Sequence, residues 1–133
     1  MYTDGDSYKK DIRCLIKVIE EFRAFDAQME LSQLLVYLLV TATPGKKVAD
    51  LLPATGLSRS ALSRNILALS KGDYRADHRA KPKPGLDLIT TVTDPFDGRA
   101  QLAAPTRRGV GLAEKISRYF HMETNDNGEE ARQ

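Results

Sequence analysis

Six side chains between residues 58 and 71 have the types and the spacing of a helix face that binds nucleic acid. Arginine can pair with a guanine edge through two hydrogen bonds, and serine can bond a base or a phosphate. A serine at the start of the helix would cap it, and the free amides of the first turn could hold a phosphate. The alternative is the solvated basic face of an ordinary helical hairpin. The six residues are Ser58, Arg59, Ser60, Ser63, Arg64 and Lys71.

A helix-turn-helix would present this face to a partner. We expect a short helix over 48–53, a turn at Gly56, and a second helix over 58–71 that carries the six residues. Glycine permits the backbone of such a turn. Leu62, Ile66 and Leu69 keep helical spacing, so they should face inward.

The remaining pattern supplies helices on both sides and a hairpin. Residues 8–27 and 30–41 should be helices, and the first should bury a stripe of apolar side chains. Residues 72–85 show no periodicity and indicate a long polar loop. Residues 86–93 and 99–104 predict two strands around a turn at 94–98, and Thr106 should cap a last helix over 106–122. The stripe expected in the first helix is Ile12, Leu15, Ile16, Ile19, Phe22 and Phe25.

The fold class indicated is mainly α, of the α+β type: a winged helix-turn-helix with a two-stranded wing. We expect one domain over 1–122, in which 46–104 bind DNA and the helices 8–27 and 106–122 form a dimer. Residues 123–133 are polar and acidic and should be a disordered tail.

The hairpin has the features of a wing. Arg99 should lie at its tip, where the negative potential of a narrow minor groove attracts arginine. Asp97 would serve the turn by its own side chain. A helix-turn-helix followed directly by such a hairpin is much more specific than either part alone.

Charge is unevenly distributed along the 133 residues, although the net charge is only +2. Residues 58–108 carry ten basic and five acidic side chains, whereas residues 1–30 carry five basic and seven acidic ones. A local basic region of this kind suits a polyanion.

Other chemistry finds little support in the sequence. We expect no enzyme and no cofactor, because no glycine-rich phosphate loop, nucleophile elbow or carboxylate pair is present. Cys14 is interpreted as a small buried hydrophobe, and the isolated His78 and His121 predict no metal site. No apolar run reaches the roughly 20 residues that cross a membrane, and the acidic start lacks a signal pattern, so a cytoplasmic protein is expected.

The sequence resembles the MarR-type winged-helix regulators over about residues 10–120. Asp97, Arg99, Thr106 and Gly109 match the wing signature of that family, and residues 56–64 are similar to the start of its recognition helix. The resemblance implies a homodimer on a palindromic site, with Arg99 in the minor groove and the face from Ser60 to Arg64 in the major groove. It also implies that Asp97 braces the wing by pairing with a neighbouring arginine. In the family the recognition helix leads almost directly to the wing, so residues 72–84 are an insertion.

Together these observations predict a sequence-specific regulator of transcription that binds double-stranded DNA, a repressor, whose effector molecule the sequence does not name. A protein-interaction module that inhibits or adapts a host factor is the alternative from another class. A replication or partition factor is a third interpretation within DNA binding.

Overall fold

The computed structural model describes the backbone of residues 6–75 and 78–132, and the side chains of these ranges as far as residue 122. The chain divides into two compact units, and each is described by itself. One unit comprises Met1–Gln28 with Leu112–Gln133, and the other is Met29–Gly111. No helix in the described residues is both long enough and apolar enough to span a membrane.

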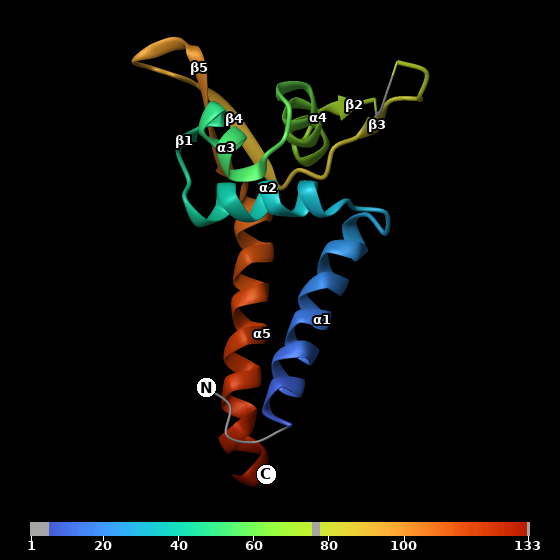
Figure 1. Cartoon of the computed structure of the whole chain (residues 1–133), viewed down its shortest axis with the longest axis vertical. Coiled ribbons are helices and arrows are strands. Elements are labelled where there is room, and N and C mark those ends of the chain that lie inside the picture. Colours follow the sequence, from blue (N-terminus) through green and yellow to red (C-terminus); the bar gives the residue numbers. More distant parts are fainter. Residues whose placement is uncertain (1–5, 76–77, 133) are drawn as a thin grey trace. The chain divides into compact units, whose positions relative to one another are not determined.

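The first unit consists of α1 (Ser7–Phe25) and most of α5 (Arg107–Arg132), which lie side by side in Figure 1. In α1 the buried side chains are Cys14, Val18 and Phe22, spaced four residues apart. The expected stripe is therefore confirmed at Phe22 and wrong at Ile12, Leu15 and Ile16, which are exposed. Both stripes have helical periodicity, and only the packing partner selects one of them.

The helix α5 continues to Arg132, ten residues past the end expected at 122. Residues 123–132 contain no proline, and a helix that is already nucleated gains one hydrogen bond for each further residue. The backbone of residues 123–132 is thus helical, whereas disorder was expected there. Their side chains lie outside the described part, as does Gln133.

The second unit places three short helices against a small antiparallel sheet (Figure 1). In the sheet β5 lies between β1 and β4, and β2 pairs with β3 separately. The elements are α2 (Leu31–Ala42), β1 (Lys46–Lys47), a 3-10 turn (Val48–Asp50), α3 (Leu51–Thr55), α4 (Arg59–Leu69), β2 (Asp73–Tyr74), β3 (Lys83–Pro84), β4 (Ile89–Asp94) and β5 (Asp97–Pro105).

Three details differ from the expectation. Residues 72–85 are not a structureless loop, because β2 and β3 form a hairpin within them. A third strand, β1, joins the two wing strands by pairing with β5; two residues are too short to give a sequence pattern. The helix α3 extends to Thr55 rather than to Pro53, because a proline in the first turn has no helical partner to lose.

The core of the second unit forms where α2, α4 and the sheet meet. Tyr37 is fully buried, and its hydroxyl donates a hydrogen bond of 2.6 Å to the carbonyl of Gly109. A Cβ atom at Gly109 would lie 1.9 Å from the carbonyl oxygen of Leu88, so the start of α5 requires glycine there. The other fully buried large side chains of this unit are Val36, Val40, Leu69, Leu88 and Ile89.

Gly109→Ala should therefore destabilise the second unit, because backbone must move to admit the methyl group. We expect a loss of about 1–3 kcal/mol, as for an overpacked core. The matched control is Gly111→Ala in the same helix, where a Cβ meets nothing within 4 Å; it should stabilise by roughly 0.5–1 kcal/mol. Urea unfolding measures both, and equal stability of the two variants would contradict the close approach.

In the first unit, Glu21 of α1 binds two side chains of α5. The Tyr119 hydroxyl donates to its carboxylate, and the Lys115 Nζ lies 3.1 Å from the other oxygen. The hydrogen bond from Tyr119 lowers the pKa of Glu21 below its ordinary 4.5, against the opposing effect of burial and with help from Lys115. The same hydrogen bond raises the pKa of Tyr119 above 10.

These directions predict how the stability of the first unit depends on pH. The lowered pKa of Glu21 contributes stability that is present above 4.5 and is lost as the pH falls through the folded-state value. Glu21→Gln should therefore be less stable than wild type at neutral pH, and the two should converge under acid. Thermal unfolding at several pH values tests this. Glu20→Gln is the control, since Glu20 pairs with Arg23 of its own helix at an exposed site; the same convergence there would contradict the role of Glu21.

Candidate nucleic-acid interface

The turn between α3 and α4 orients the face that the sequence singles out. Gly56 adopts φ +70°, a left-handed conformation that glycine tolerates, and its amide donates to the carbonyl of Leu52 at 2.9 Å. Ser58 is the N-cap of α4, since its Oγ accepts the amide of Ala61 at 3.1 Å. The second helix of the helix-turn-helix, α4, thus begins at Arg59, directly after its N-cap Ser58.

The inward and outward faces of α4 lie as the spacing predicts. Leu62, Ile66 and Leu69 are buried. The candidate binding residues Ser58, Arg59, Ser60, Ser63, Arg64 and Lys71 are all exposed.

Two points of this face differ from the expectation. Lys71 lies beyond the end of α4 at Leu69, so it belongs to the segment that leads into β2. Leu67 is exposed on the same side as Ser60 and Arg64, at i+7 and i+3 from them. Leu67 was not expected on this face, because an apolar residue in a helix usually belongs to the core. An apolar side chain on such a face could contact a thymine methyl group.

A cleft of about 420 Å³ lies between α4 and the wing. Arg59 and Ser63 line it from α4, Arg99 and Gln101 line it from β5, and Lys47 lines it from β1. Three cations thus surround one hollow, which concentrates positive potential there. Lys47 and Gln101 were missed, and only the pairing of Lys47 with Leu102 across β1 and β5 brings them to the cleft.

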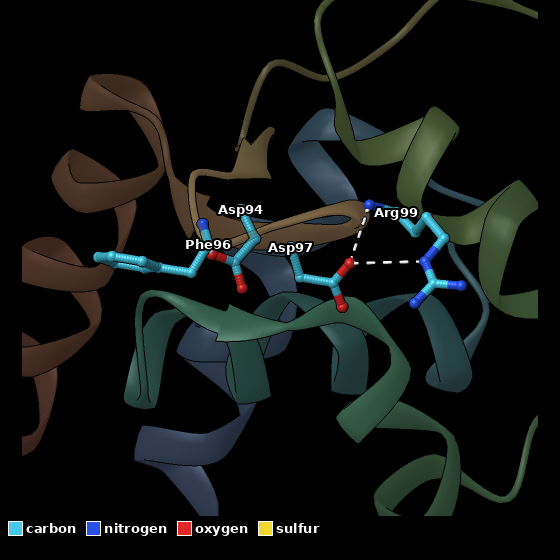
Figure 2. Close-up of polar contacts among 4 residues, drawn as sticks. All are labelled: Asp94, Phe96, Asp97 and Arg99. Carbon is cyan, nitrogen blue, oxygen red and sulfur yellow. Dashed lines mark hydrogen bonds and ion pairs between the residues drawn. The ribbon is translucent and has the colours of Figure 1, made fainter.

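The wing turns through Pro95 and Phe96, between the paired residues Asp94 and Asp97. The Asp94 carboxylate accepts the amide of Phe96 at 2.9 Å, and Asp97 accepts the amide of Arg99 at 3.1 Å. The Arg99 Nε also lies 3.7 Å from the Asp97 carboxylate (Figure 2). Asp97 therefore holds the backbone and the guanidinium of Arg99 together.

The apex of the wing carries an aromatic side chain rather than Arg99. Phe96 is 97% exposed and points away from Arg99 in Figure 2. Arg99 lies two residues after the turn, on β5, with its side chain 96% exposed. The sequence signal for this was the Pro-Phe pair between two aspartates, which fixes a two-residue turn and leaves its second residue at the apex.

The remaining candidates are not among the residues that line the cleft. Cys14 is 2% exposed in the first unit, which confirms its interpretation as a buried side chain. His78 lies between β2 and β3, and His121 lies on α5. Within the described residues, no three His, Cys, Asp or Glu side chains gather as metal ligands would.

Solved structures share the fold of this chain at low sequence identity. The protein RV1404 from Mycobacterium tuberculosis is 18% identical, with a TM-score of 0.62, over 97% of this chain and 82% of that one. MarR is 17% identical, with a TM-score of 0.54, over 84% and 75%. The PcaV transcriptional regulator from Streptomyces coelicolor, solved with its natural ligand, is 20% identical, with a TM-score of 0.52, over 74% and 60%.

The chain has the winged-helix fold of the MarR-type regulators. No protein-family model and no curated protein sequence matches it, and the match spans only 60% of the PcaV chain. In this fold α4 is the second helix of the helix-turn-helix, and β4 with β5 forms the wing. The hairpin of β2 and β3 lies between them in the chain.

Proposed function

We propose that this protein is a sequence-specific regulator of transcription that binds double-stranded DNA, without enzymatic activity, in the cytoplasm. The observation that carries the proposal is the exposed face of α4 beside a cleft lined by Lys47, Arg59 and Arg99. A helix fits the width of the major groove, and arginine is the side chain that reads guanine there. The regulators that share the fold support the same class of function.

On this proposal Ser60, Ser63 and Arg64 contact base edges, while Ser58, Arg59 and Lys71 contact phosphates. Arg99, held by Asp97, reaches the minor groove beside the recognition helix. A small protein seated on a promoter excludes polymerase by its volume, so we propose a repressor.

Arg64→Ala and Arg99→Ala should weaken binding in different ways. A bidentate contact from Arg64 would contribute about 1–3 kcal/mol of discrimination at one base pair of each half-site. Its loss should relax sequence preference there. Arg99 reads the groove mainly by its potential, so its loss should weaken all sites and most of all those flanked by A·T pairs.

The measurement starts from duplexes selected out of a random pool by the wild-type chain, followed by titration of base-substituted variants. Ser117→Ala on α5 is a control with an exposed side chain outside the interface. If no duplex is selected, or if both arginine variants bind every duplex as wild type does, DNA binding by this face is overturned. The protein-interaction module then takes its place, with the exposed Phe96 as its natural contact.

We further propose that the protein acts as a homodimer through the first unit. Tyr8, Ile12, Leu15 and Ile16 of α1 are exposed, as are Phe120 and Met122 of α5. Apolar surface of this extent on two adjacent helices indicates a protein interface. A dimer with a two-fold axis suits a palindromic site, with one half-site for each copy of α4.

Ile12→Glu and Phe120→Glu should give folded monomers, because Ile12 is 49% and Phe120 52% exposed within one chain. Sedimentation measures the mass, and circular dichroism checks the fold. Arg13→Glu, at an exposed position of the same helix, is the charge control and should remain dimeric. A wild-type monomer at tens of micromolar would contradict the dimer and leave DNA binding by α4 to be judged separately.

A further inference from the structure

The inserted hairpin of β2 and β3 is more cationic than the wing. Residues 71–84 carry five basic and two acidic side chains, whereas residues 92–101 carry one basic and two acidic ones. Phosphate contacts supply most of the non-specific affinity of DNA-binding proteins. The strongest local source of that affinity is therefore not the wing. The five basic residues are Lys71, Arg75, Arg79, Lys81 and Lys83, all exposed.

The base of the hairpin is attached to the end of α4. The amide of Gly85 donates to the carbonyl of Gly72 at 3.0 Å, and the amide of Leu86 donates to the carbonyl of Ala68 at 2.9 Å. A Cβ atom at Gly85 would lie 1.7 Å from the carbonyl oxygen of Ser70, so the chain passes in direct contact with the helix end. The hairpin consequently keeps a fixed position relative to the recognition helix.

The hairpin also has contacts of its own, and two of its basic side chains take part in them. Tyr74 pairs with Lys83 across the strands, and the Lys83 Nζ lies 5.5 Å from the centre of the Tyr74 ring. The Arg75 guanidinium donates to the carbonyl of Ala80 at 3.4 Å. Pro82 and Pro84 offer no amide at the edge, which disfavours pairing with another strand. The hairpin is thus built to present charge rather than to extend a sheet.

In Figure 1 the wing and this hairpin extend to opposite sides of α4. If α4 occupies a major groove, elements on its two sides face the two flanking sugar–phosphate backbones. Lysine suits such a site because its ammonium is a point charge that needs no fixed geometry.

We propose that the β2–β3 hairpin is a second DNA-binding arm, which holds the sugar–phosphate backbone on the side of α4 opposite the wing through Lys71, Lys81 and Lys83. This inference rests on the proposed function and assigns to it a further contact surface. The arm lengthens each half-site without reading its sequence, and it takes over the phosphate contacts that the acidic wing is poorly suited to make.

The test compares the full chain with the triple substitution Lys71→Ala, Lys81→Ala and Lys83→Ala on a selected duplex, over about 50–200 mM salt. Because each phosphate contact contributes about 0.9 to the slope of log K against log salt, the slope should decrease by about 3 for each protomer. Preference among base-substituted duplexes should stay unchanged. Ethylation interference should show that the flanking phosphates sensitive in wild type become insensitive.

The control removes the same charge from α1, with Lys9→Ala, Lys10→Ala and Lys17→Ala. It should change the slope by less than the roughly 0.9 that one phosphate contact contributes. The single variant Lys81→Ala, at an exposed position, keeps the test independent of any folding defect and should lower the slope by about 1. If wild type binds duplex DNA and the hairpin variants keep its slope and its interference pattern, this proposal is overturned together with the phosphate contact of Lys71, while DNA binding by α4 stands. If wild type selects no duplex at all, the proposed function is overturned and this arm with it.

Discussion

The second unit depends on the backbone of residues 85–88 lying directly against the last turn of α4. The last carbonyls of a helix have no partner within it. Here the carbonyls of Ala68, Leu69 and Ser70 accept hydrogen bonds of 2.8–3.2 Å from the amides of Leu86, Leu88 and Asp87, respectively. The approach is possible because Gly85 has no Cβ. Asp87 meanwhile adopts φ +58°, which aspartate tolerates better than most residues. Each such hydrogen bond contributes about 0.5–1.5 kcal/mol, so the segment also caps α4.

The same segment determines where the other elements begin. The carbonyl of Leu88 accepts the amide of Thr106 at 3.1 Å, and the carbonyl of Asp87 accepts the Thr106 hydroxyl at 2.7 Å. Thr106 in turn caps α5 by accepting the amide of Gly109 at 3.0 Å. One short stretch of backbone therefore fixes α4, the start of β4 and the start of α5 together. Groups on α4 and on the wing are thus held in place without a partner, so on the proposed function little ordering entropy would be lost when DNA binds.

The distribution of charge matters more than its sum. A net charge of +2 gives little attraction for a polyanion, yet Lys47, Arg59 and Arg99 converge on one cleft. At the wing, the Asp97 carboxylate offsets the single cation that the family resemblance places in the minor groove. The hairpin of β2 and β3 adds more positive charge, since residues 71–84 carry five basic and two acidic side chains. Local electrostatics of this kind control encounter rate and salt dependence rather than fold.

The sequence alone determined the order of the five helices and the wing, and the inward face of α4, because these follow from periodicity, glycine turns and local capping. Ser58 and Thr106 were identified as caps for the same reason: their bonding partners lie within three residues along the chain. Only the tertiary structure decided which apolar stripe of α1 is buried, since Cys14 and Ile12 fit a helical period equally well. Likewise the pairing of β1 with β5, the contact of Gly85 with α4 and the approach of Lys47 to Arg99 join residues far apart in sequence. Local propensity carries no information about such contacts, because they depend on how elements pack once they have formed.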